Sequence, residues 1–144
     1  MASRKRKAIT IYGRDYPTND GTCIRDYVHV LDICAAHLLA LKALQNGKKE
    51  LLYNLGTGHG FSVQQVIEVA RSVTEQVIPV LDGPRRLGDP AILVADAALA
   101  KKELDWQPQY SDLDTLIRHA WHYQKKINQI LGGNDHAVKS DRSY

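Results

Sequence analysis

The 144-residue chain has no long hydrophobic run and only two cysteines. No apolar stretch reaches the roughly 18 residues of a membrane-spanning helix, and the most apolar helical segment, residues 33–44, is interrupted by His37 and Lys42. Cys23 and Cys34 stand alone, without a CxxC or Cys/His spacing, which argues against a metal site and against a disulfide scaffold. These absences predict a protein of the reducing cytoplasm that does not enter a membrane.

A large excess of one charge is also missing outside the first seven residues. The chain has 19 Lys and Arg against 16 Asp and Glu, for a net charge of +3. Four of the basic residues lie in the segment 1–7, which has no apolar core of the kind that a secretory signal contains. The rest of the chain is close to neutral, so it is not expected to bind nucleic acid in bulk. We interpret residues 1–7 as a solvated basic tail, with a nucleic-acid role as the alternative.

Motifs for nucleophilic or dinucleotide chemistry are absent as well. No Ser/His/Asp or Cys/His arrangement is evident. Residues 56–60 (GTGHG) follow an expected strand and precede a helix, but the G-x-G-x-x-G pattern requires glycine where Phe61 stands. We therefore interpret this loop as a tight strand-to-helix turn. His119 and His122 share a helix face without a third ligand, which favours an ordinary amphipathic helix over a zinc site.

Strand-like and helix-like segments alternate along the chain. Apolar and β-branched runs predict strands at residues 8–12, 51–55, 77–81 and 92–95. Apolar residues at helical spacing predict helices at residues 32–44, 63–75, 96–104 and 112–131. Their expected end signals are Asp32, a Ser62/Gln65 capping box, Asp96, Ser111 and Gly132-Gly133. This alternation predicts an α/β layer structure with parallel strand pairing.

Two turn-rich runs each join arginine to a carboxylate. The first is DYPTNDGTCIRDYVHV at residues 15–30, and the second is RRLGDPA at residues 85–91. An arginine held on a constrained loop suits bidentate capture of phosphate, and a nearby carboxylate suits acceptance of hydrogen bonds from sugar hydroxyls. Together the runs indicate a nucleotide-sugar site. On their own they support no more than a phosphate-binding α/β domain, and solvated surface arginines are the alternative.

These two runs, together with YNLGTGHGFSV, LVAD and ELDWQP in their order, resemble UDP-glucose 4-epimerase, an extended short-chain dehydrogenase/reductase. The resemblance covers roughly residues 8–126 and concerns only the C-terminal portion of such an enzyme. It implies the C-terminal substrate-binding domain of an NAD(P)-binding Rossmann-type enzyme, with a small partly parallel sheet and flanking helices. We expect a basic tail at residues 1–7, an incomplete UDP-sugar-binding domain at 8–131 and a flexible tail at 132–144.

The resemblance also implies a set of substrate-binding residues: Tyr12, Arg25, Tyr27, Val63, Arg86 and Asp89. In this set Arg25 and Arg86 match the positions that hold the UDP phosphates, and Asp89 matches the acceptor of the ribose hydroxyls. The backbone at Tyr12 would face the uracil, while Tyr27 and Val63 would lie beside the nucleotide. A simple acid at the start of a strand or helix is the alternative for Asp89, and a core tyrosine is the alternative for Tyr27.

Two devices of the family's chemistry have no counterpart in this sequence. These epimerases bind NAD on an N-terminal Rossmann domain and use a Tyr-x-x-x-Lys pair, in which lysine lowers the pKa of the tyrosine. None of the seven tyrosines has lysine four residues later. We therefore expect a chain that starts mid-domain, in the manner of a truncated reading frame or a split subunit, and that does not catalyse UDP-glucose/UDP-galactose interconversion alone.

The expected partners follow from the same resemblance. They are a UDP-sugar and either a complementary N-terminal Rossmann fragment or further copies of the chain, because a sheet with one flank missing exposes apolar faces and unpaired edges. A non-catalytic remnant or interaction subunit is the alternative function. A sister enzyme, such as a decarboxylase or dehydratase of nucleotide sugars, is a third possibility, although the Asp-Tyr-Pro-Thr and Asp-Gly-Thr pieces fit the epimerase better.

Overall fold

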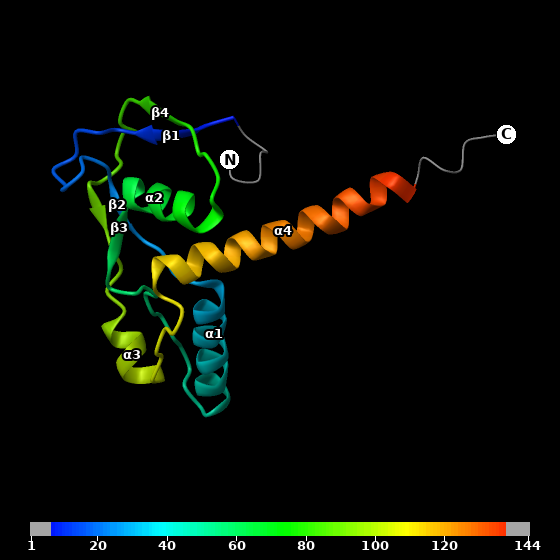
Figure 1. The fold of residues 1–144 in the computed structure, drawn as a ribbon. Helices are drawn as coiled ribbons and strands as arrows, with labels where there is room; N and C mark the ends of the chain where they lie inside the picture. Colours follow the sequence, from blue (N-terminus) through cyan, green and yellow to red (C-terminus); the bar gives the residue numbers. More distant parts are fainter. Residues whose placement is uncertain (1–6, 138–144) are drawn as a thin grey trace.

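The computed structural model describes residues 7–137, with side-chain surroundings up to residue 130, and these form an α/β structure (Figure 1). Its elements are β1 (Ile9–Tyr12), β2 (Ile24–Asp26), α1 (Val30–Gln45), β3 (Gly60–Ser62), α2 (Val63–Thr74), β4 (Val80–Gly83), β5 (Ile92–Leu93), α3 (Ala98–Leu104) and α4 (Leu113–Ala137). In Figure 1, α4 extends away from the rest of the described fold. Among the described residues, no helix has the length and apolar character needed to cross a membrane.

The strands form two small sheets. Strands β1 and β4 pair in parallel, with Tyr12 opposite Gly83. In the second sheet β2 lies in the middle, antiparallel to β3 and parallel to β5, so that Arg25 is opposite both Phe61 and Leu93. The expected α/β class with partly parallel pairing is confirmed, and the pairing is divided between two sheets. This arrangement places Arg25 at the centre of one sheet and Tyr12 at the end of the other.

The main apolar cluster joins α1 to α3 and the segment that follows α3. Its buried members are Ala36, Ala97, Ala100, Leu104 and Trp106. The indole N–H of Trp106 donates a hydrogen bond of 2.8 Å to the backbone oxygen of Asp32. Because Trp106 is fully buried and its polar atom is paired, this side chain anchors α1 to the chain beyond α3.

The expectation that Asp32 caps α1 is wrong. His29 is the N-cap, and its Nδ1 accepts a hydrogen bond of 3.1 Å from the backbone N–H of Leu31. Asp32 lies in the first turn, where it is buried, and its two carboxylate oxygens accept the backbone N–H groups of Gln109 and Tyr110 at 2.9 and 3.0 Å. The carboxylate therefore fixes a distant loop in place of its own helix start, because that loop supplies two backbone donors.

Helix α2 begins as the sequence predicts. The Ser62 hydroxyl accepts from the N–H of Gln65 at 3.1 Å, and the Gln65 side chain accepts from the N–H of Ser62 at 2.9 Å, which completes the capping box. The helix ends at Thr74, and Glu75 adopts a left-handed conformation with φ of 54°. Ile67 on its inner face is buried, and α2 packs against α4.

Several elements differ from the sequence predictions. Strands β2 and β3 were not predicted, and the expectation that Asp96 caps α3 is wrong, because Ala97 is the N-cap and has no capping side chain. Residues 51–55 form no strand with any described residue, and β4 begins at Val80, directly after Pro79. Strand β5 is shorter than predicted and ends at Leu93. Helix α4 continues through Gly132 and Gly133 to Ala137, because glycine weakens a helix without ending it. The remainder of the predicted C-terminal tail (138–144), like most of the basic tail (1–6), lies outside the described residues.

Candidate functional site

Tyr12 and Arg86 come together at the end of β1. The Arg86 guanidinium carbon lies 4.1 Å from the centre of the Tyr12 ring, in the geometry of a cation–π contact. The pairing of Tyr12 with Gly83 brings the segment after β4 to this place, since parallel strands end on the same side. Two predicted site residues that are 74 positions apart in the sequence are therefore in contact.

Arg25 and Asp89 form a second pair. The Arg25 Nη2 group donates to the Asp89 carboxylate and also to the backbone oxygen of Pro90, at 2.9 Å in the latter case. Both charged side chains are only about a quarter exposed or less, so water screens the pair incompletely. The sequence places these residues in separate runs, and the structure joins them because β2 and β5 pair in parallel.

One turn connects the two pairs. The backbone N–H of Asp89 donates to the backbone oxygen of Arg86 at 3.2 Å, and Gly88 between them has φ of 75°, a value that glycine adopts easily. Residues 85–90 line an open hollow of about 470 Å³, which includes Arg86 and Asp89 among its walls. Arg25 reaches this turn through Asp89 and Pro90, although it does not itself line the hollow.

Arg85, beside Arg86, contacts the preceding loop. Its Nε group donates to the Asp15 carboxylate at 2.7 Å, and its guanidinium lies 4.3 Å from the centre of the Tyr16 ring. The hydrogen bond from Arg85 lowers the pKa of Asp15. A Cβ atom at Gly13 would lie 2.7 Å from the Arg85 side chain, so only glycine permits this close approach. The 85–90 turn is thus held against the loop that follows β1.

The two remaining predicted residues, Val63 and Tyr27, lie close to the ends of β2. Val63 is the first residue of α2, and its N–H donates to the backbone oxygen of Cys23 at 3.1 Å. Tyr27 follows β2 and is half-buried, and this burial raises the pKa of its hydroxyl. Among the described residues, no hydrogen bond or ring contact joins Tyr27 or Val63 to the two arginine pairs. Their part in a ligand site stays a prediction.

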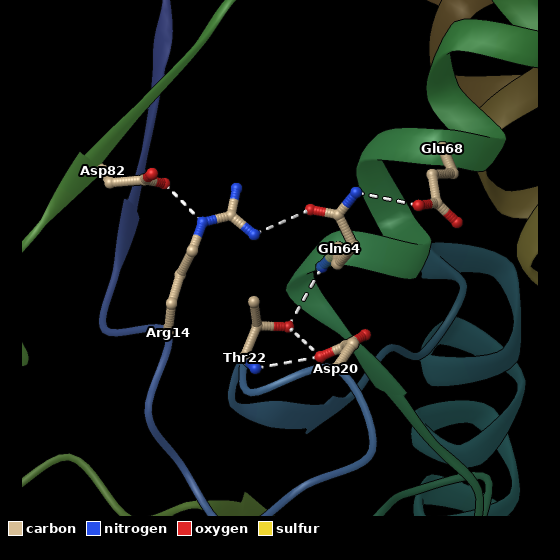
Figure 2. A network of polar contacts seen from close by, with 6 residues as sticks. All are labelled: Arg14, Asp20, Thr22, Gln64, Glu68 and Asp82. Carbon is tan, nitrogen blue, oxygen red and sulfur yellow. Dashed lines mark hydrogen bonds and ion pairs between the residues drawn. The ribbon is translucent and has the colours of Figure 1, made fainter.

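Figure 2 shows a polar network that the sequence patterns did not predict. Arg14 pairs with Asp82 on β4 and donates to the side-chain oxygen of Gln64 on α2 at 3.3 Å. The Thr22 hydroxyl accepts from the N–H of Gln64 at 3.2 Å and donates to Asp20 at 2.7 Å. The network therefore fixes the loop between β1 and β2, which leads into Arg25.

Asp20 is the acceptor at the centre of this loop. Its carboxylate accepts from the N–H and hydroxyl of Thr22 and from the hydroxyl of Ser62. Burial opposes ionisation, but the hydrogen bonds from Ser62 and Thr22 lower the pKa of Asp20 overall. No local pattern signals this role, because Ser62 lies 42 positions further along the chain.

The glycine-rich loop packs closely against the chain that follows β5. A Cβ atom at Gly56 would lie 2.6 Å from the Ala95 side chain, and one at Gly60 would lie 2.8 Å from Val94. The small residues therefore permit close packing against the segment after β5. Thr57 in the same loop is tied to Asp26 through its N–H and its hydroxyl, at 3.1 and 2.8 Å. The loop is therefore a closely packed strand-to-helix connection, which agrees with its interpretation as a tight turn.

The rings of His29, His119 and Tyr110 form a packing cluster. The buried His29 contacts Nδ1 of His119 through its Nε2 at 3.0 Å, and the Tyr110 ring lies 5.0 Å from the His29 ring. Since Nδ1 of His29 accepts from Leu31, its Nε2 bears the proton and donates to His119. His29 is thus a packing and capping residue. Within residues 7–137, no group of three or more potential side-chain ligands is placed to hold a metal ion.

Comparison with known proteins places the chain in a family. Residues 2–120 match the family described as GDP-mannose 4,6 dehydratase. UDP-glucose 4-epimerase of Lacticaseibacillus casei is 48% identical over 132 residues, which are 92% of this chain and 40% of that protein. The Corynebacterium glutamicum UDP-glucose 4-epimerase is 45% identical over 139 residues, which are 96% of this chain and 41% of that protein.

Solved structures agree with this assignment. A UDP-glucose 4-epimerase from Stenotrophomonas maltophila, solved with bound NAD and formylated UDP-arabinopyranose, superposes with a TM-score of 0.84 at 40% identity and covers 90% of this chain and 38% of that chain. The Bifidobacterium longum UDP-glucose 4-epimerase in complex with NAD+ and UDP superposes with a TM-score of 0.77 at 39% identity. The match covers 87% of this chain and 37% of that chain. The chain therefore spans about two fifths of the relatives that it matches. It belongs to the GDP-mannose 4,6 dehydratase family, within which it is similar to one portion of the UDP-glucose 4-epimerases.

Proposed function

We propose that this chain is the UDP-hexose-binding, C-terminal portion of a UDP-glucose 4-epimerase. Residues 8–131 form the binding domain in this proposal, and α4 continues past its end to Ala137. One observation carries it: the Arg25–Asp89 and Tyr12–Arg86 pairs, drawn from distant segments, meet at a single turn. The similarity to epimerases solved with UDP or a UDP-sugar supports the choice of ligand.

The two arginines have different tasks in this proposal. Arg86 contacts a neutral ring and makes no ion pair with a described residue, so its N–H groups can receive a phosphate. Arg25 is paired with Asp89 and exchanges this carboxylate for phosphate oxygens when the ligand binds. Asp89 is thereby released to accept from ribose hydroxyls. Charge-assisted hydrogen bonds of this kind contribute about 1.5–3 kcal/mol each.

The proposed activity ends at binding. The given sequence has neither the Tyr-x-x-x-Lys pair nor the G-x-G-x-x-G pattern, so the proposal assigns no hydride or proton transfer to its residues. Interconversion of UDP-glucose and UDP-galactose, the galactose-metabolism step of the family, then requires an NAD-binding portion with a tyrosine base. An epimerase assay with and without added NAD tests this point. Turnover by the purified chain alone would overturn the non-catalytic assignment.

A calorimetric titration with UDP tests the binding proposal. At about 100 µM protein, wild-type chain is expected to release heat and saturate, and Arg86→Ala is expected to weaken binding ten- to a hundredfold, because one decade corresponds to about 1.4 kcal/mol. Arg118→Ala is the matched control, since Arg118 forms an exposed ion pair with Asp114 on α4. No heat from the wild-type chain would overturn the proposal, and an unchanged affinity of Arg86→Ala would remove that residue from the site.

A second candidate function is that of an interaction subunit that needs a separate NAD-binding half. It is favoured by the exposed leucines of α1, among them Leu31, Leu38 and Leu41. The two functions are compatible, because binding of UDP involves the turn at residues 85–90 and α1 belongs to a different cluster. Activity that appears only on mixing with such a half would support this second function.

A further inference from the structure

Arg85 and Arg86 are adjacent in the sequence but have different surroundings. The Arg86 guanidinium lies over the Tyr12 ring and forms no ion pair with a described residue. Arg85 binds Asp15 twice, because its Nε group donates to the carboxylate at 2.7 Å and its Nη2 group donates to the backbone oxygen. The Arg85 guanidinium carbon also lies 4.3 Å from the centre of the Tyr16 ring. Protein groups therefore occupy Arg85, whereas Arg86 keeps its N–H groups for a ligand.

The wall against which Arg85 lies is fixed within its own loop. Tyr16 is only 5% exposed. Its backbone N–H donates to the backbone oxygen of Gly21 at 3.0 Å, and its backbone oxygen accepts from the N–H of Thr18 at 2.7 Å. A Cβ atom at Gly13 would lie 2.6 Å from the Tyr16 ring and 2.7 Å from the Arg85 side chain, so the three groups are closely packed. The guanidinium therefore rests on a surface that has little freedom to move.

The loop that holds Arg85, residues 15–22, continues into β2, which carries Arg25. The polar network of Figure 2 fixes the end of this loop. Arg25 in turn donates to the carboxylate of Asp89, which belongs to the same turn as Arg85. The contacts form a closed circuit from the loop through β2 to the turn and back to the loop. Arg85 is the side chain that closes this circuit at the start of the turn.

We propose that Arg85 is a positioning residue of the UDP site, which holds the turn so that Arg86 and Asp89 reach one ligand together with Arg25. The inference rests on the proposed function, because it concerns the same site. A binding constellation has to be held to within about 0.5 Å of its productive geometry. Arg86 has only the Tyr12 ring and the backbone of the turn to set its place, so the contacts of its neighbour decide where it points.

Geometry, and not added charge, is what Arg85 supplies. The hydrogen bond from Arg85 lowers the pKa of Asp15, so this carboxylate is ionised at neutral pH and cancels the charge of the arginine. The planar guanidinium donates from two nitrogens to two acceptors of Asp15 while it lies over a ring. A lysine at this position keeps the positive charge but lacks the rigid fork that makes these contacts together. Arg85→Lys therefore separates the positioning role from simple attraction of phosphate.

Calorimetric titration of the full chain with UDP is the first test. Arg85→Ala is expected to weaken UDP binding about tenfold and Arg85→Lys about fivefold, whereas Arg118→Ala should stay within about twofold of wild type. Arg118 is the matched control because its ion pair with Asp114 is also exposed, with 54% of the Arg118 side chain accessible against 43% for Arg85. Thermal unfolding checks that each variant is folded, which is expected because exposed ion pairs contribute little to stability.

Nuclear magnetic resonance reads the position of Arg86 without any ligand. Because its guanidinium lies over the Tyr12 ring, the ring shifts the side-chain proton resonances of Arg86 upfield. Both Arg85 variants are expected to lose about half of this shift, because the cation–π contact loosens, and Arg118→Ala should keep it. If wild-type chain gives no heat with UDP, the proposed function fails, and the Arg86 resonances still decide whether Arg85 sets its neighbour in place.

Two results would overturn the inference. One is an unchanged Arg86 shift in a folded Arg85 variant, which would show that the turn keeps its place without the contacts to Asp15 and Tyr16. The other is wild-type UDP affinity in Arg85→Lys, which would show that a positive charge alone is sufficient at this position.

Discussion

Helices α1 and α2 differ in how they are capped and in how much of their apolar surface the described chain covers. Helix α2 has a full capping box and a single buried apolar face, with Ile67 only 2% exposed. Helix α1 is capped by a histidine and leaves one of its two apolar faces exposed. One helix is stabilised by residues close in sequence and by contacts within the chain, while the other has more apolar surface than the chain covers. The apolar face of α2 is therefore covered within the described chain, whereas one apolar face of α1 is exposed.

The largest expected effect compares one buried and one exposed aliphatic residue. Ile67→Ala on α2 should lower the free energy of unfolding by about 2–5 kcal/mol, because it leaves a cavity. Leu41→Ala on the outer face of α1 should change it by no more than about 0.5 kcal/mol, since Leu41 is half exposed. Urea denaturation of both variants measures the difference. Equal losses would show that the outer face of α1 is already covered in the isolated chain.

A smaller effect is expected at the start of α2. Ser62→Ala should destabilise the chain by about 1–2 kcal/mol, because the cap of α2 and a hydrogen bond to Asp20 are both lost. Ser72→Ala, at an exposed position within the same helix, is the matched control and should be close to neutral. Thermal unfolding at neutral pH measures both variants. A neutral Ser62→Ala would mean that tertiary packing, and not the capping box, starts the helix.

The smallest effect concerns the contacts of Glu103 with Lys48 and Tyr53. Hydrogen bonds from Lys48 and Tyr53 lower the pKa of Glu103 from its usual value near 4.5. A carboxylate with a lowered folded-state pKa stabilises the fold above its unfolded pKa, and this contribution is lost as the pH falls through the folded value. Glu103→Gln should therefore slightly lower the melting temperature at pH 6–7, and this difference should shrink as the pH falls below 4.5. A difference that persists unchanged at pH 3 would contradict this assignment.

Local patterns predicted the elements that depend on local contacts. The Ser62/Gln65 box needs only residues three positions apart, and the strand ending at Tyr12 needs only an apolar run, so both were predicted correctly. The strand predicted at residues 51–55 has the right alternation but no neighbour among the described residues. Periodicity shows which side chains face inward, but it does not show whether a neighbouring strand is present.

In the candidate site, too, local patterns indicated single residues but not the contacts between distant segments. The turn-rich runs indicated Arg25, Arg86 and Asp89, and the structure places Asp89 within contact of Arg25. The contact of Arg86 with Tyr12 depends on the parallel register of β1 and β4, which no local pattern fixes. The pairing of Arg14 with Asp82 joins residues 68 positions apart and was not predicted for the same reason. Whether the six predicted residues bind a UDP-sugar stays a prediction.

Helix α4 has a practical consequence for measurement. Its 25 residues correspond to about 37 Å at 1.5 Å per residue, and Figure 1 shows most of that length projecting clear of both sheets. A fluorophore or surface tether attached toward its far end would be held away from both sheets. Helix α4 would thus separate the sheets from a surface to which the chain is attached for binding measurements.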